Sequence, residues 1–220
     1  MQPFIEALKL KYLVNRFGDV ALRFYEHLVL TLVALVIALL IALPLGVVLH
    51  RYRRLAGPVM TLLNVVYTIP SLALLVLLLT VPFIGLGTDN AVIVLVVYAQ
   101  IILVRNIFVG LNGVDPHVIE AARGMGMSNW QRLLQVELPL ALPVIIAGIR
   151  IAAVTIIGIA MVAGLINAGG LGRLLFDGIT RDYPDMIVAG AIGAATLAGL
   201  ANLGLRLVER WVSLAVHGDA

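Results

Sequence analysis

The chain has 220 residues, of which 62% are hydrophobic and only 12% are charged. A soluble globular domain is closer to half apolar and a quarter charged, so this composition excludes an ordinary soluble protein. The net charge of +3 is explained by basic residues that flank membrane spans and does not indicate nucleic-acid binding. The absence of cysteine excludes disulfides and thiol chemistry.

Residues 1–27 carry charged side chains throughout and contain no uninterrupted apolar core of the kind found in a cleaved signal peptide. Four apolar residues in this segment can share one face of a short helix: Phe4, Ile5, Leu8 and Tyr12. We therefore expect an N-terminal interfacial segment over 1–27.

Uncharged runs of about 20 residues, long enough to cross the hydrocarbon core, recur along the rest of the chain. The runs lack the strict alternation of a β-barrel and predict an all-α, polytopic membrane protein. We expect a five-helix transmembrane domain over 28–208 and a tail over 209–220, with spans at 28–49, 57–80, 90–110, 140–163 and 186–207. Thr68 and Ser71 flank Pro70 in the second span, which predicts a kink there.

The short loops predict the orientation. Residues 51–54 contain three arginines, whereas 81–89 contain no lysine or arginine. Cytoplasmic loops are enriched in these residues, so the first loop is expected inside and the second outside. This places the N-terminus and the 164–185 loop outside and the 111–139 loop and the C-terminus in the cytoplasm. The four basic residues of 1–27 oppose this assignment.

In the fifth span, Ala191, Ala195 and Gly199 recur every four residues. Small residues on one face allow helix backbones to approach closely. The pattern fits either packing within the chain or an interface between subunits.

The 111–139 loop is far longer than a connection between two spans requires. Asp115 can cap a helix that begins at Pro116. Two glycines then break the helix, and the S-x-x-Q spacing at 128–131 starts a second one that is expected to end near Pro139. The loop therefore predicts a compact projection of two short helices on the cytoplasmic face.

The same loop contains EAA, three residues, glycine, nine residues and V-E-L-P. This spacing resembles the EAA loop of binding-protein-dependent ABC import permeases, EAA-x3-G-x9-I-x-L-P, with Val136 in place of isoleucine. The residues at the other fixed positions are Glu120, Ala121, Ala122, Gly126, Leu138 and Pro139.

The resemblance implies a type I ABC importer permease with a cytoplasmic coupling helix that docks on the ATP-hydrolysing subunit. It also implies a second permease subunit, identical or homologous, two ATP-binding cassette ATPases and an extracytoplasmic substrate-binding protein. The expected location is the cell (inner) membrane of a bacterium or archaeon. No catalytic residue is implied in this chain.

Three further segments resemble the osmoprotectant branch, which imports glycine betaine, carnitine or choline: 67–73, 111–116 and 168–172. The last lies in the final outer loop and contains Gly169, Gly170 and Gly172, with Asn167 where the branch implies a glycine. Permeases for methionine or sulfonates share the five-span core, so these solutes remain alternatives. A passive channel or an intramembrane enzyme is the alternative from another class.

The chain has no G-x-x-x-x-G-K-[ST] loop, so ATP and magnesium are expected on the separate ATPase, and no cofactor or metal on this chain. Polar residues inside spans are costly in lipid and are candidates to line a translocation pathway, although hydrogen bonding between helices explains them equally well. These candidates are Asn64, Tyr67, Pro70, Ser71, Gln100, Asn106 and Thr155. Arg105 and Arg150 are expected to snorkel toward the inner interface or to pair with a loop acid.

Overall fold

The computed structural model describes residues 9–218, and this part of the chain is helical and contains no strand. Of the expected N-terminal apolar face, only Tyr12 lies among the described residues. The helices are α2 (Lys11–Asn15), α3 (Phe17–Arg51), α4 (Arg53–Thr68), α5 (Ser71–Leu78), α6 (Thr88–Asn112), α7 (Pro116–Gly124), α8 (Asn129–Arg132), a π-helical turn η1 (Leu133–Glu137), α9 (Leu138–Val162), a 3-10 turn η2 (Ala163–Ile166), α10 (Gly170–Thr180) and α11 (Pro184–His217).

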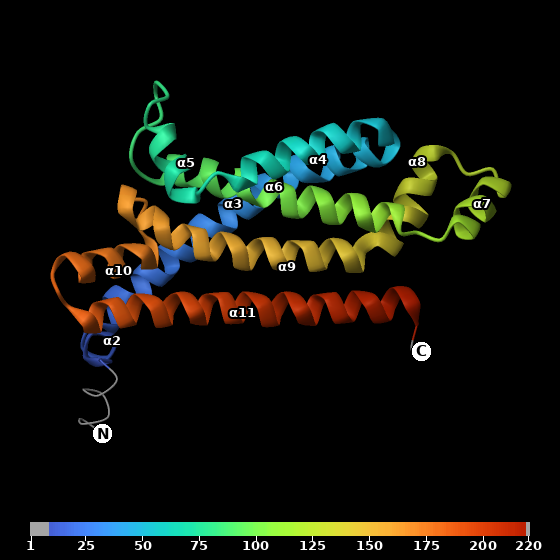
Figure 1. Cartoon of the computed structure of the whole chain (residues 1–220). Coiled ribbons are helices and arrows are strands. Elements are labelled where there is room, and N and C mark those ends of the chain that lie inside the picture. The colour runs from blue at the N-terminus through green and yellow to red at the C-terminus, as the bar shows by residue number, and fades with distance from the viewer. Residues whose placement is uncertain (1–8, 219–220) are drawn as a thin grey trace.

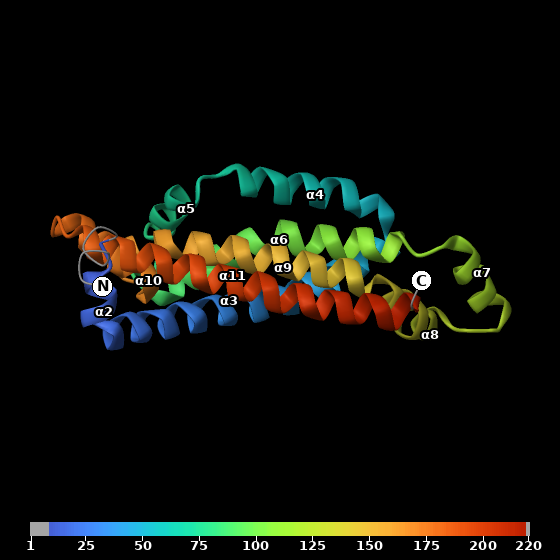
Figure 2. The ribbon, with the colours of Figure 1, turned by 90° about the horizontal axis from the view of Figure 1, so that it is seen from below.

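The long helices run side by side along one axis, and their connections gather at the two ends of the bundle (Figure 1). One end holds the N-terminal helix α2 together with α5 and α10. The other end holds the corner between α3 and α4, the pair α7 and α8, and the C-terminus. Figure 2 shows α4 on the outside of the bundle, separate from α11.

Four helical stretches in the described residues are long and apolar enough to cross a membrane: α3, α6, Asn129–Ile166 and α11. The pair α4 and α5, bent by 90° at its break, counts as a fifth. The predicted all-α, five-span architecture is therefore confirmed.

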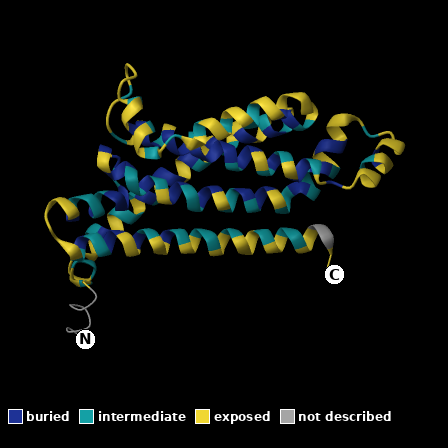
Figure 3. Ribbon diagram, viewed as in Figure 1, coloured by how far each residue is buried: buried dark blue, intermediate teal, exposed yellow. Residues whose placement is uncertain are grey.

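Helix α6 lies at the centre and packs on α3 and α9, and small residues on α3 make the close approach possible. Ala34, Ala38, Ala42 and Gly46 recur every four residues and are buried. A Cβ at Gly46 would overlap the side chain of Ile107 on α6. Because lipid gives no hydrophobic drive between helices, such close backbone contact is the main source of packing energy. Figure 3 shows the buried residues along this contact and exposed residues over α4 and the α7–α8 end.

The first helix begins earlier than expected and the last one ends later. Helix α3 starts at Phe17 rather than at 28. Residues 17–27 of the expected N-terminal segment are therefore continuous with the first span. Arg23 stabilises this polar start through ion pairs with Asp19 at 3.8 Å and Glu26 at 2.9 Å. Helix α11 likewise continues through the expected tail to His217.

The second span is broken rather than kinked. Ile69 is extended, with φ −67° and ψ 126°, because a residue that precedes proline disfavours the helical conformation. Pro70 then begins the turn into α5, and the hydroxyl of Tyr98 on α6 donates a hydrogen bond to the Ile69 carbonyl. The freed carbonyl at the break is thereby satisfied by a neighbouring helix.

One predicted loop structure is wrong. The second loop helix does not end near Pro139, because α8, η1 and α9 form one continuous helix. The π-helical turn lies just before Pro139, where the N–H of Leu138 bonds to the carbonyl of Leu133, and it provides a wider turn where proline lacks a donor. The outer 164–185 loop contains the 11-residue helix α10, which no sequence pattern predicted.

Candidate functional site

The tip of the 111–139 loop is formed by α7. As expected, Asp115 caps it by accepting a hydrogen bond from the N–H of His117 at 2.9 Å, and Pro116 occupies the first turn. The three motif residues on α7 face different ways. Glu120 and Ala121 are exposed, whereas Ala122 is only 2% exposed. Glu120 and Ala121 are therefore open to a partner, while Ala122 packs within the chain.

Gly126 connects α7 to α8 in a left-handed conformation, with φ +78°. A Cβ built there meets no atom within 4 Å, so the requirement for glycine is conformational and not steric. The predicted capping box follows: the N–H of Ser128 donates to Gln131 Oε1 at 2.8 Å, and the N–H of Gln131 donates to Ser128 Oγ at 3.3 Å. These bonds fix the sharp corner that separates the two short helices.

The base of the loop holds a buried charge cluster that the sequence did not predict. Glu137, 2% exposed, accepts a hydrogen bond from Arg132 and lies 2.8 Å from Nε2 of His50. His50 belongs to the last turn of α3, so the cluster ties the loop to the corner between α3 and α4. Glu137 occupies a variable position of the EAA pattern, so the motif does not predict a role for this residue. Leu138 and Pro139 follow it, half-buried at the start of α9.

The three residues of this cluster line one part of a cavity of about 580 Å³. It is lined by basic and aromatic side chains of the α3–α4 corner and of the loop, including Arg51, Arg53, Arg123, Trp130 and Arg132. Beside it, Met125 and Trp130 are large apolar side chains that remain 74% and 65% exposed. The loop thus presents an apolar surface bordered by charge.

The structure brings one part of the predicted pathway set together on the face between α4 and α6. Asn64 accepts a hydrogen bond from Arg105 at 3.0 Å. One turn further along α4, the ring of Tyr67 packs against Tyr98 with centroids 5.5 Å apart. Pro70 and Ser71 follow at the break between α4 and α5. Neither Arg105 nor Tyr98 was among the predicted pathway residues, because Arg105 was expected to snorkel or to pair with a loop acid and no sequence pattern singled out Tyr98.

The other predicted pathway residues make hydrogen bonds to helix carbonyls, and only the bond of Gln100 is buried. Gln100 is 8% exposed and donates to the Ala38 carbonyl on α3 at 3.1 Å. Asn106 donates to a carbonyl of its own helix at 2.7 Å and packs against Gly148 of α9. Thr155 donates to the Ile151 carbonyl at 2.8 Å. These contacts are those of polar groups that stabilise helices and helix pairs.

Arg150 was expected either to snorkel or to pair with a loop acid, and in the structure it forms an ion pair with an acidic residue. Its partner is Glu209 at 3.0 Å, and Arg150 also donates to Asn202 at 3.2 Å. Both partners belong to α11 rather than to a loop.

The row of small residues on α11 does not pack within the described chain. Ala191 and Ala195 are exposed, so packing inside this part of the chain does not account for the row.

At the opposite end of the bundle, the glycine-rich segment of the outer loop folds against α3. The N–H of Gly170 donates to Glu26 at 2.9 Å, and Gly169 and Gly170 have φ of +80° and +69°. A Cβ at Gly172 would overlap the Met161 carbonyl of α9. Asn167 has φ +61°, a left-handed conformation that asparagine tolerates in place of glycine. The three glycines therefore allow the backbone of the outer loop to lie directly against α3 and α9.

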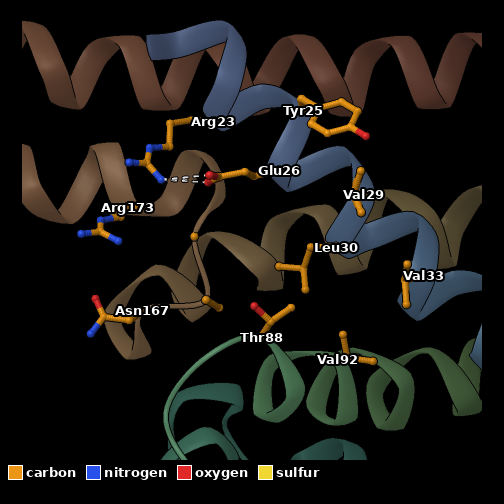
Figure 4. Close-up of a pocket in the computed structure, with 12 residues that line it drawn as sticks. Arg23, Tyr25, Glu26, Val29, Leu30, Val33, Thr88, Val92, Asn167 and Arg173 are labelled. Atoms are coloured by element: carbon orange, nitrogen blue, oxygen red, sulfur yellow. Dashed lines mark hydrogen bonds and ion pairs between the residues drawn. The ribbon is translucent and has the colours of Figure 1, made fainter.

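Figure 4 shows the cavity of about 450 Å³ beside this turn. Glu26 and Arg23 point toward one another from α3, and Arg173 projects from α10 near them. Below the pair the wall is apolar, with Val29, Leu30 and Val92. Within residues 9–218, no three His, Cys, Asp or Glu side chains gather to hold a metal ion.

Comparisons with known proteins agree with this arrangement. The carnitine transport permease OpuCB of Listeria monocytogenes is 42% identical over 185 residues, 84% of each chain. The osmoprotectant import permease OsmW of Salmonella typhimurium is 40% identical over 190 residues, covering 85% of this chain and 88% of the relative. A solved structure of the MetNI methionine ABC transporter, described as inward facing, superposes with a TM-score of 0.81 at 25% identity, covering 90% of this chain and 98% of that one.

Residues 34–216 match the family described as the binding-protein-dependent transport system inner membrane component. That range begins within the first span and includes the complete EAA loop and the other four spans. The chain therefore belongs to this family, the membrane permease subunits of ABC importers.

Proposed function

We propose that this permease imports an osmoprotectant, with glycine betaine, carnitine and choline as its candidate solutes. The observation that carries the proposal is the likeness over most of the chain to permeases named for these solutes. A relative in Bacillus subtilis named for glycine betaine, carnitine and choline transport is 37% identical over 92% of this chain. Methionine is the competing solute, because the solved MetNI structure shares the fold.

In this proposal, two permease subunits form the pathway and two ATP-binding cassette ATPases drive it. ATP and magnesium are held by the ATPases, and this chain needs no cofactor. The exposed Glu120 and Ala121 on α7, with the apolar side chains of Met125 and Trp130 nearby, supply the surface that docks on the ATPase. A separate extracytoplasmic binding protein delivers the solute to the opposite end of the bundle.

The orientation follows from the same proposal. The arginines of the α3–α4 corner, the EAA loop and the C-terminus share one end of the bundle, and α2, α5 and α10 share the other (Figure 1). Basic loops favour the cytoplasm, so the first end is proposed to be cytoplasmic and the N-terminal end extracytoplasmic. ATPase docking requires the same orientation.

The test is uptake of radiolabelled solutes by cells that carry or lack the complete transporter, at high external osmolarity. Glycine betaine, carnitine and choline are supplied singly, with methionine as the control solute. We expect deletion of the permease to remove uptake of at least one quaternary ammonium solute and to leave methionine uptake unchanged. Loss of methionine uptake alone would contradict the proposed solute class while leaving the family intact.

A further inference from the structure

Two arginines lie well inside membrane-spanning helices, Arg105 on α6 and Arg150 on α9. Among residues 9–218, Arg150 is neutralised by Glu209, whereas no carboxylate forms an ion pair with Arg105. Arg105 is exposed and lies seven residues before the end of α6 at Asn112, about 10 Å along the helix axis. Charged groups at such depth are costly unless they face water or a counter-charge. Arg105 therefore requires an anionic group or water from outside the described chain.

An aromatic pair lies next to this arginine. The rings of Tyr67 and Tyr98 are 5.5 Å apart and tilted by 55°. Tyr98 is only 5% exposed, and its hydroxyl is held by the Ile69 carbonyl, whereas Tyr67 is 42% exposed. Tyr98 thus fixes the position of Tyr67 and leaves part of the Tyr67 side chain open. The face of an aromatic ring attracts cations, including quaternary ammonium groups.

The two features are adjacent because α4 and α6 are antiparallel across this face. Asn64 contacts Arg105, and Tyr67 contacts Tyr98. On α4 the two contacts are three residues apart, about 4.5 Å along the axis, and on α6 they are seven residues apart, about 10 Å. A group that attracts cations and a group that attracts anions therefore lie on the same α4–α6 face, about one helical turn apart on α4. Asn64 is a neutral partner of Arg105, and a carboxylate, which makes a stronger charge-assisted bond, can replace it.

We propose that Tyr67 and Arg105 form a solute site on the α4–α6 face, where Tyr67 binds a quaternary ammonium group and Arg105 binds the carboxylate of the same solute. The proposal rests on the proposed function, because it takes an osmoprotectant as the solute. Glycine betaine and carnitine carry both charges and use both residues. Choline carries the cation without a carboxylate and uses Tyr67 alone.

The test compares glycine betaine and choline in proteoliposomes that contain the complete transporter, with binding protein and ATP supplied. Arg105→Gln should lower the ratio of glycine betaine uptake to choline uptake by about tenfold or more, the loss expected for one charge-assisted contact. Tyr67→Leu should reduce uptake of both solutes, and Tyr67→Phe should retain both. Arg150→Gln is the matched control, because it removes another arginine within a span and should leave the ratio unchanged.

Direct binding of each radiolabelled solute to the permease–ATPase complex, with the binding protein omitted, gives the same ratio independently of binding-protein preference. If Arg105→Gln affects both solutes equally, Arg105 pairs with a lipid phosphate or with an acid of a second permease copy, and the proposed site is wrong. Full uptake of both solutes by Tyr67→Leu would also overturn it. A wild-type transporter that imports none of glycine betaine, carnitine and choline would instead reject the proposed function.

Discussion

Glu26 on α3 accepts a hydrogen bond from the N–H of Gly170 at 2.9 Å, across 144 positions of the chain. Arg23 holds the same carboxylate at 2.9 Å. A Cβ at Gly170 would lie 2.9 Å from Nδ1 of His27, and the φ of +69° is one that L side chains rarely adopt. The outer loop reaches α3 only because residue 170 has no side chain, and this contact orders one end of the bundle.

Gly170→Ala should therefore destabilise the permease, by about 1–3 kcal/mol for the left-handed conformation alone. Gly18→Ala is the control, since Gly18 lies in α3 with no atom within 4 Å of a built Cβ and should change stability by less than about 0.5 kcal/mol. The measurement is the midpoint of thermal unfolding of each purified variant in detergent. Equal midpoints for the two variants would show that the contact between the outer loop and α3 does not contribute to stability.

The sequence predicted the spans, the capped helix α7 and the corner at Gly126 because each depends on local signals. Uncharged runs, an aspartate before a proline and the Ser128–Gln131 spacing all specify structure within a few residues. The same signals missed the continuity of α8 with α9. The sequence around Pro139 predicts a helix end, because proline lacks a hydrogen-bond donor. In the structure, the π-helical turn that precedes Pro139 allows the helix to continue.

Long-range pairings account for the remaining differences. His50 and Glu137 are 87 positions apart, and no spacing rule links them. Arg105 was expected to snorkel or to pair with a loop acid. Its hydrogen bond to Asn64, one turn from Tyr67 on α4, depends on the packing of α4 against α6, which no local pattern predicts. The choice between packing and pathway for Gln100 likewise depends on its contact with the Ala38 carbonyl of α3.

The pair of Arg150 and Glu209 should stabilise the contact between α9 and α11. Arg150→Leu leaves Glu209 without its counter-charge and should destabilise the protein by about 2 kcal/mol, less than a fully buried pair because both side chains are 27% exposed. The double variant Arg150→Leu/Glu209→Leu removes both charges and should recover most of the loss. Thermal unfolding of the single and double variants checks this. A double variant no more stable than Arg150→Leu would show that the loss is not due to the unpaired acid.

Tyr12 on α2 predicts a dependence on alkaline pH. Burial, and the hydrogen bond that its hydroxyl donates to Asp19, raise the pKa of Tyr12 from 10.0 to about 12. A raised pKa favours the neutral phenol in the folded state, so its contribution is complete below pH 10 and is lost as the pH rises toward 12. The stability difference between wild type and Tyr12→Phe should shrink over this range. A difference that stays constant from pH 9 to 12 would contradict the assignment.

The proposed orientation can be tested by labelling, because the chain contains no cysteine. Arg53→Cys lies at the corner between α3 and α4, and Leu86→Cys lies in the 79–87 connection between α5 and α6, where Leu86 is 64% exposed. In intact cells, a membrane-impermeant maleimide should label residue 86 and should label residue 53 only after permeabilisation. Labelling of both positions from outside would contradict the assignment of these loops to opposite sides.

The proposed coupling to the ATPase is expected to depend on the corner at Gly126. Its φ of +78° favours glycine, although asparagine and aspartate tolerate it, and the open space around it means that a substitution affects the corner and its partner but not the core. Gly126→Asp should leave the permease inserted and thermally stable. It should abolish uptake and weaken retention of the ATPase, because it adds a side chain and a negative charge to the corner where the loop is proposed to dock.

The control for this variant is Gly124→Ala, since Gly124 also has open space around it but no positive φ. ATPase co-purification and uptake in vesicles are measured for both variants and for wild type. We expect Gly124→Ala to retain the ATPase at close to the wild-type level, because alanine is compatible with the last position of α7. If the loop had no partner, Gly126→Asp would leave uptake and ATPase retention as close to the wild-type level as Gly124→Ala does. Normal uptake and normal ATPase retention by Gly126→Asp would therefore show that this corner does not transmit ATP-driven movement to the spans.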